Sequence, residues 1–98
     1  MAEQKIDINL SEEVADGLYS NLAIISHSST EFIVDFASIL PGMKKGKVVS
    51  RVIMTPQNAK RLLNALAENV SKFEQQNGTI TENQNNNLPP IMNGGGFA

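Results

Sequence analysis

The sequence predicts an α+β domain, in which a four-stranded antiparallel β-meander carries one C-terminal amphipathic helix on one face. Two patterns indicate this fold: short alternating apolar segments separated by turns, and one long segment with helical periodicity. A third observation is a final stretch rich in Asn, Gly and Pro, which predicts a disordered tail. With 98 residues the chain has room for one domain, expected over residues 1–78, followed by the tail over 79–98.

The first predicted strand is Lys5–Leu10, where Ile6, Ile8 and Leu10 alternate with polar residues. The acidic stretch that follows is either a loop or one helical turn capped by Ser11. Three further strands are expected at Tyr19–His27, Glu31–Leu40 and Val48–Met54. Few residues separate the second strand from the third, so we expect an antiparallel hairpin there.

The helix is expected to begin at Thr55-Pro56, because a capping hydroxyl precedes a proline at the first helical position. An apolar stripe then follows at steps of three and four residues, through Ala59, Leu62, Leu63, Leu66, Val70 and Phe73. The stripe favours a helix packed on the sheet; the alternative is a surface for a partner helix. Asn77-Gly78 ends the helix after about five turns.

Both faces of the predicted sheet carry apolar residues, but one helix covers only one face. The second face is expected to leave Ile33, Val49, Ile53 and Ile25 unprotected, beside Asp35 and Arg51. We infer that a protein partner covers this face, with Glu31, Asp35 and Arg51 framing the interface. The alternative is that the N-terminal strand or its acidic loop folds over it.

The charges divide into blocks: −6 over residues 1–35, +6 over residues 36–67 and −2 over residues 68–98. The basic block contains Lys44, Lys45, Lys47, Lys60 and Arg61. These residues either contact a phosphate or an acidic protein surface, or they form a solvated edge of the domain. Arg51 is also placed to pair with Asp35 across the strands. The tail holds apolar islands that suit a short linear motif, or else only solubilise the chain: Leu88, Pro89, Pro90, Ile91, Met92 and Phe97.

Several function classes are excluded by residue content. The chain has no Cys and one His, which excludes thiolate chemistry and multi-histidine metal sites. His27 beside serines is typical of a turn rather than an acid–base pair with Asp35 or Glu31, and the Glu12, Glu13 and Asp16 cluster lacks calcium-loop spacing. We expect no enzyme activity, no cofactor, no metal and no small-molecule substrate. The absence of a signal-peptide pattern and of a long apolar run predicts a cytoplasmic protein that does not bind membranes.

Two longer runs are more specific: YSNLAIISHSSTEFIVDFASILPG, and VVSRVIMTPQNAKRLLNALAENVSKFEQQNG. Over about residues 5–80 the chain resembles the prokaryotic family of domain of unknown function 3467, whose pattern keeps a YSN start, an EF-x-x-DF strand, a PG turn, an SRVxMTP segment and an AKRLL helix. The resemblance implies no reaction and no catalytic residue. It does imply a transcription partner, since genes of similar proteins in some bacteria lie beside the gene for the β′ subunit of RNA polymerase.

These observations favour a non-enzymatic interaction module. The leading hypothesis is an accessory protein or small subunit of a large cytosolic assembly, with bacterial RNA polymerase as the first candidate. The alternative is a self-associating domain that pairs second face to second face in a homodimer. A third hypothesis is weak nucleic-acid binding through the basic loop that contains Lys44, Lys45 and Lys47.

Overall fold

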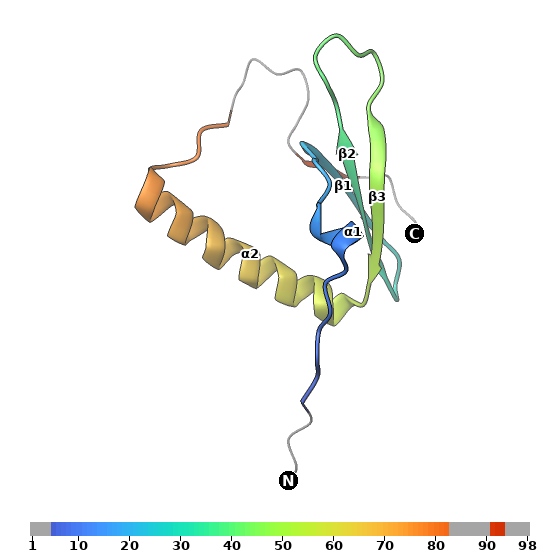
Figure 1. Ribbon diagram of the computed structural model, residues 1–98, viewed down its shortest axis with the longest axis vertical. Helices are drawn as coiled ribbons and strands as arrows, with labels where there is room; N and C mark the ends of the chain where they lie inside the picture. Colours follow the sequence, from blue (N-terminus) through green and yellow to red (C-terminus); the bar gives the residue numbers. More distant parts are fainter. Residues whose placement is uncertain (1–4, 83–90, 94–98) are drawn as a thin grey trace.

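The computed structural model describes residues 5–82 and 91–93. Figure 1 shows a twisted sheet, a short helix in front of it and a long helix that leaves the sheet at one end. In chain order the elements are α1 (Glu12–Ala15), β1 (Leu22–His27), β2 (Phe32–Ser38), β3 (Lys47–Met54), α2 (Pro56–Asn77) and β4 (Ile91–Asn93). The strand order across the sheet is β3-β2-β1-β4.

Three of the predicted strands are confirmed as β1, β2 and β3, and neighbours in the chain pair antiparallel. A tight turn joins β1 to β2: the Ser28 N–H donates to the Glu31 carbonyl at 2.9 Å. The Ser28 hydroxyl in turn accepts from the N–H groups of Thr30 and Glu31. One serine therefore satisfies the donors at the tip of the hairpin, as short polar residues in turns commonly do.

The predicted first strand at Lys5–Leu10 is wrong, because within the described chain this segment pairs with no strand. Its apolar side chains face solvent, with Ile8 90% exposed. An alternating segment forms a strand where it reaches a sheet edge, and this segment pairs with neither of the outer strands, β3 and β4. The acidic stretch after it does form one helical turn, α1, in which Ser11 Oγ accepts from the Val14 N–H at 3.3 Å.

The short strand β4 pairs in parallel with β1, in a register that places Ile91 beside Ala23. The sequence assigned this segment to a disordered tail, so the pairing at Ile91–Asn93 differs from the prediction. Residues 83–90 and 94–98 lie outside the described residues, and for them the tail stays a prediction. The proposed tail motif falls largely there, with Leu88, Pro89, Pro90 and Phe97.

The helix α2 begins and ends where the sequence predicts. Thr55 is extended, with φ −68° and ψ 154°, and its hydroxyl accepts from the Asn58 N–H at 3.1 Å. Pro56 lies in the first turn, where a missing N–H costs no helical hydrogen bond. At the other end Gly78 has φ 87° and donates its N–H to the Glu74 carbonyl, so the chain leaves the helix there.

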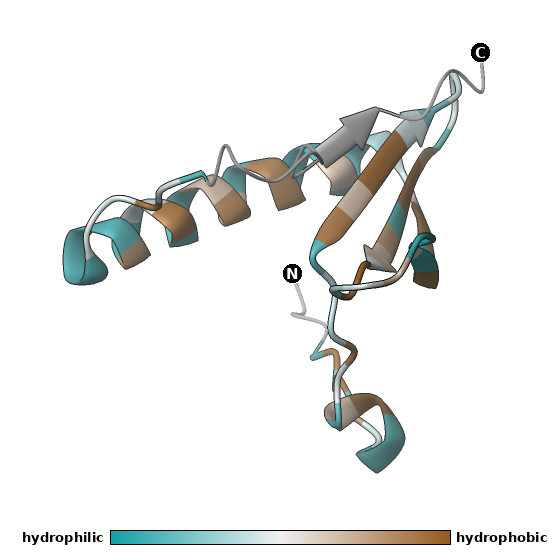
Figure 2. Cartoon of the chain, turned by 90° about the horizontal axis from the view of Figure 1, so that it is seen from above, coloured by the Kyte–Doolittle hydropathy of each residue, from teal (hydrophilic) through white to brown (hydrophobic). Residues whose placement is uncertain are grey.

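The predicted packing of α2 on the sheet is wrong. Figure 2 shows the helix projecting away from the strands, with hydrophobic bands along its length. Among the described side chains of α2 none is buried, and the extensive contacts between elements join β1 to β2, β2 to β3 and β1 to β4. The connection explains this: Thr55 is the single residue between β3 and α2, and its cap and the following proline restrict its backbone.

The pairing register defines two faces of the sheet. The groove face consists of Ala23, Ile25, His27, Phe32, Val34, Phe36, Ser50, Val52 and Met54. The ion-pair face consists of Leu22, Ile24, Ser26, Ile33, Asp35, Ala37, Val48, Arg51 and Ile53. Ile25 was expected beside Ile33 on the second face, but it lies on the groove face, opposite Val34. The buried apolar side chains among the described residues are Leu22, Val34 and Ala37.

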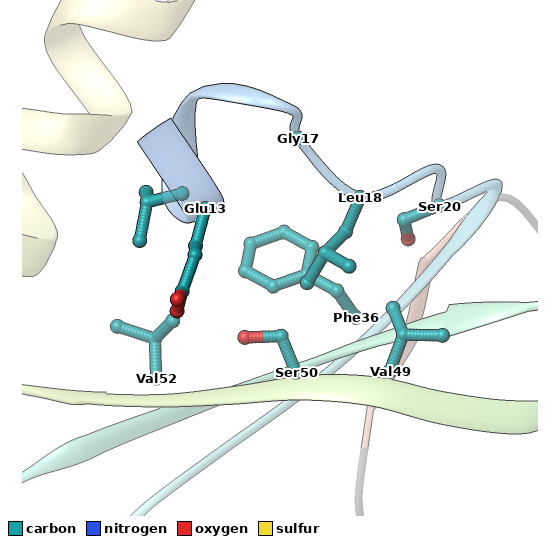
Figure 3. Close-up of a pocket in the computed structure, with 9 residues that line it drawn as sticks. Glu13, Gly17, Leu18, Ser20, Phe36, Val49, Ser50 and Val52 are labelled. Atoms are coloured by element: carbon teal, nitrogen blue, oxygen red, sulfur yellow. The ribbon is translucent and has the colours of Figure 1, made fainter. Parts of the chain in front are cut away.

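A β-bulge in β3 also displaces Val49 from the face predicted for it. Phe36 lies opposite Ser50 and the next residue of β2 lies opposite Val48, so the pairing skips Val49. Figure 3 shows its side chain on the same side of the strand as that of Ser50. Strict alternation assigns Val49 to the face of Ile53, and this is wrong because the extra residue shifts the alternation.

Candidate interaction surface

A groove lies between the N-terminal segment and the groove face of the sheet. Residues 11–20, here called the arch, pass over β2 and β3 and leave space beneath them (Figure 3). The cavity has a volume of about 560 Å³. Val14 and Leu18 in its wall are largely exposed, so this space is an open groove and not an enclosed packing defect. Its apolar lining comes from Val14, Leu18, Phe36, Val49 and Val52, and its polar lining from Glu13, Ser20 and Ser50.

Local chain chemistry shapes the arch. The helix α1 stops at Gly17, whose N–H donates to the Val14 carbonyl at 3.0 Å and whose φ of 78° suits glycine. The chain then turns back, and Figure 3 shows the Leu18 side chain directed toward Phe36 across the groove. Val14 and Leu18 nevertheless remain largely exposed, since the arch is one turn of helix and a loop. The sequence did not predict this groove, because it assigned the same sheet face to the helix.

The end of the arch is tied to the sheet by Ser20 and Asn21, two residues of the YSN run. Ser20 Oγ donates to the Ala37 carbonyl at 2.9 Å. The Asn21 amide donates to the Ile39 carbonyl at 2.8 Å and accepts from the Ile39 N–H at 2.9 Å. This side chain reproduces the two bonds of a hydrogen-bonded strand pair. Sequence reasoning missed this role, although short polar residues just before a strand are its typical signal.

The apolar stripe of α2 is a second exposed surface. Leu63, Leu66 and Phe73 are 65%, 57% and 51% exposed. Isolated helices are marginal in water and gain most of their stability by packing an apolar face. This helix has 22 residues, and within the described part of the chain none of its side chains is buried.

The predicted ion pair is present on the ion-pair face, where Asp35 of β2 lies opposite Arg51 of β3. The guanidinium binds in bidentate fashion: Nε and a terminal nitrogen donate to the two carboxylate oxygens at 2.6 and 2.8 Å. These hydrogen bonds hold the pKa of the Asp35 carboxyl below its ordinary value of 3.8, against the opposing effect of burial. The pair therefore places a fixed, planar charged group in the middle of this face.

Beside the ion pair, Ile33 and Ile53 lie opposite each other and form an apolar centre. Ile33 is half-buried and Ile53 is 56% exposed. The alternative that the acidic loop covers this face is wrong, because the arch lies over the groove face instead. The predicted set around Ile33, Asp35, Arg51 and Ile53 is thus brought together, without Val49.

The predicted basic residues are not brought together. Lys44, Lys45 and Lys47 are exposed in the β2–β3 loop and at the start of β3, after a turn in which Gly42 has φ 83°. Lys60 and Arg61 lie in the first turns of α2, beyond the opposite end of β3 (Figure 1). A strand of 8 residues separates the two groups, which is about 26 Å of chain. They cannot act as one compact phosphate site.

The residues considered for catalysis or metal binding are also separated. His27 stacks on Phe32 on the groove face, with ring centroids 5.3 Å apart. Asp35 lies on the opposite face, so the two do not form an acid–base pair. Within residues 5–82 and 91–93 no group of three His, Asp or Glu side chains is placed to hold a metal ion. No helix in the described part of the chain has the length and apolar character to cross a membrane.

Comparison with known protein families confirms the resemblance. The model of the family described as "Protein of unknown function (DUF3467)" matches residues 1–82. The chain belongs to this family. The match spans the arch, β1 to β3 and α2, which include the groove, the ion pair and the stripe. No curated protein and no solved structure matches the chain.

Proposed function

We propose that the chain is a non-enzymatic protein-interaction module, an accessory protein or small subunit of a larger cytosolic assembly. The observation that carries this proposal is the exposure of apolar side chains on two surfaces, the α2 stripe and the ion-pair face. Soluble chains seldom leave contiguous apolar patches in water unless another surface covers them. The family description assigns no reaction that would favour another class.

The surface offered to the larger assembly is the ion-pair face. Ile53 and Ile33 supply an apolar centre, and Asp35 with Arg51 supplies a charged group with fixed geometry beside it. Interfaces commonly combine a desolvated apolar anchor with Arg-centred polar contacts. The basic loop at Lys44, Lys45 and Lys47 extends from the same sheet and favours an acidic partner surface.

Bacterial RNA polymerase is the first partner to test. The support for it is the family resemblance, through the gene neighbourhood that it implies, and not the chemistry of the surface. Nucleic acid is not proposed, because the five bases are divided between the two ends of β3. Salt-sensitive binding of the chain to DNA alone would contradict this choice.

The test is binding of the tagged full chain to purified RNA polymerase core enzyme, measured by interferometry. We expect Ile53→Glu to abolish binding, since a carboxylate would be desolvated at the apolar centre. Ile80→Glu is the matched control, because Ile80 is 48% exposed and Ile53 56%, and neither change removes a buried contact. Absence of binding by the unmodified chain would remove the polymerase assignment. Equal binding by both variants would remove the ion-pair face.

A further inference from the structure

We propose that the groove beneath the arch is the docking site for α2 of a second copy of the chain, in a reciprocal, helix-exchanged homodimer. The proposal rests on the proposed function in one respect, that exposed apolar surfaces here are binding surfaces. It uses the groove face and the stripe, and leaves the ion-pair face free for the larger assembly.

The groove and the stripe match in chemistry. Phe36, Val49 and Val52 form an apolar floor, and Leu18 closes the groove from above. The stripe from Leu62 to Phe73 extends about 17 Å along the helix, at about 1.5 Å per residue. Val49 to Val52 extend about 10 Å along β3 in the groove floor, which is the length of about two helical turns. A helix docked at the open side of the groove would insert apolar side chains over this floor and keep its polar side in water.

The helix of the same chain is held away from this groove. Met54 ends β3 and Pro56 begins α2, so one residue makes the connection. Thr55 caps the helix through its hydroxyl, and the proline after it disfavours the α region for its backbone. Folding α2 back over its own sheet would require a change of backbone direction within the short segment from Met54 to Pro56. Short connections of this kind favour exchange of an element between two copies.

The charges of the two parts are complementary. The arch carries −3 from Glu12, Glu13 and Asp16, and Glu13 lies in the wall of the groove. The helix carries +2 over residues 56–67, but Arg61 lies on its polar side, so Lys60 is the base that can meet the arch. Lys60 follows the stripe residue Ala59, so it lies at the flank of the apolar surface. Both charge sets belong to one chain, so a two-fold arrangement makes the same contact twice, and opposite charges at the rim favour the correct encounter.

Cysteine cross-linking of the full chain tests the exchange directly, since the natural sequence contains no Cys. One variant combines Val52→Cys in the groove with Leu66→Cys on the stripe, and mild oxidation follows. We expect a covalently linked dimer on a non-reducing gel. A disulfide within one monomer would overturn the proposal, because it would place α2 in the groove of its own chain. Absence of any disulfide would overturn it too.

Two controls fix the surface. Ile53→Cys with Leu66→Cys probes the opposite face of the sheet and is expected to give little cross-link; linkage there in preference to Val52 would contradict the groove. Separate chains carrying Val52→Cys or Leu66→Cys are then mixed. Their mixture is expected to link, and either chain alone is expected to link much less.

Light scattering on the purified chain supplies an independent readout. We expect twice the monomer mass of 10.6 kDa, and 10.6 kDa for Leu66→Glu. Asn64→Glu, on the polar side of the same helix, is expected to remain dimeric. A monomeric unmodified chain at micromolar concentration would overturn the proposal, as would a dimer that Leu66→Glu leaves intact. If such a monomer still bound the larger assembly through Ile53, the helix exchange would be refuted and the proposed function would stand. A dimer that does not bind the larger assembly would support the helix exchange and refute the proposed function.

Discussion

The sheet and the helix α2 differ in how far their apolar side chains are buried. Each of β1, β2 and β3 pairs with a neighbour, and Val34 and Ala37 at the centre are 7% and 3% exposed. The helix has correct ends and a regular apolar stripe, yet Leu66 is 57% exposed. The difference teaches that periodicity identifies an apolar face but not the molecule that covers it. Four predictions can break or sharpen this contrast.

The largest expected difference is between Val34→Ala in the sheet and Leu66→Ala in the helix. Val34 is buried, so its truncation should lower the free energy of unfolding by about 2 kcal/mol at every protein concentration. Leu66→Ala should cost almost nothing in dilute, monomeric chain and more as concentration rises. Urea unfolding at several concentrations measures both. Equal losses at high dilution would show that Leu66 packs within its own chain.

A smaller effect is expected at the junction of the two regions. Thr55→Ala removes the hydroxyl that accepts from the Asn58 N–H, and should destabilise the chain by about 1 kcal/mol. Thr55→Ser keeps the oxygen and is the control. Circular dichroism during urea unfolding reports the loss. A full loss with Thr55→Ser would assign the effect to the methyl group and not to the cap.

The ion pair should make the sheet sensitive to acid. Because the pKa of Asp35 is lowered in the folded chain, the ionised carboxylate contributes stability above the unfolded value, near 3.8, and the contribution is lost as pH falls below it. Solvent screens the largely exposed Arg51 side chain, so the change should be modest. Unfolding at pH 6 and at pH 2.5 should differ less for Asp35→Asn than for the unmodified chain. An unchanged pH dependence would contradict the assignment.

The smallest effect is expected on the solvent side of α2. Lys72 lies 3.4 Å from Glu68, one turn away, and both side chains are highly exposed. Lys72→Ala should cost about 0.3 kcal/mol, and less in high salt. Helicity measured at low and at high salt tests this. A loss as large as that of Val34→Ala would mean that this side of the helix is also covered.

Local signals in the sequence were sufficient for the elements with local causes. Thr55, Pro56 and Gly78 fix the ends of α2 by capping and backbone preference, and both can be seen in the residue types alone. The β1–β2 hairpin and the Asp35–Arg51 pair followed from short spacing and alternation. These features depend on neighbours in the chain or directly across a strand pair.

The parts that could not be predicted depend on longer-range relations. The alternation at Lys5–Leu10 was real, but no strand edge among the described residues receives it. The bulge at Val49 has no glycine to mark it in the sequence, and it exchanges the faces of the residues before it. The groove could be predicted only by knowing that α2 does not cover the sheet, and the apolar stripe of the helix indicates the opposite.

That single-residue connection has a consequence for how the chain behaves in the cell. One residue links β3 to α2, so α2 has little freedom to reach the groove of its own chain. If the groove of a second copy covers the stripe, as proposed above, covering it is a second-order process. The copy number of the protein, and not a property of the isolated molecule, would set the fraction of helices that are covered.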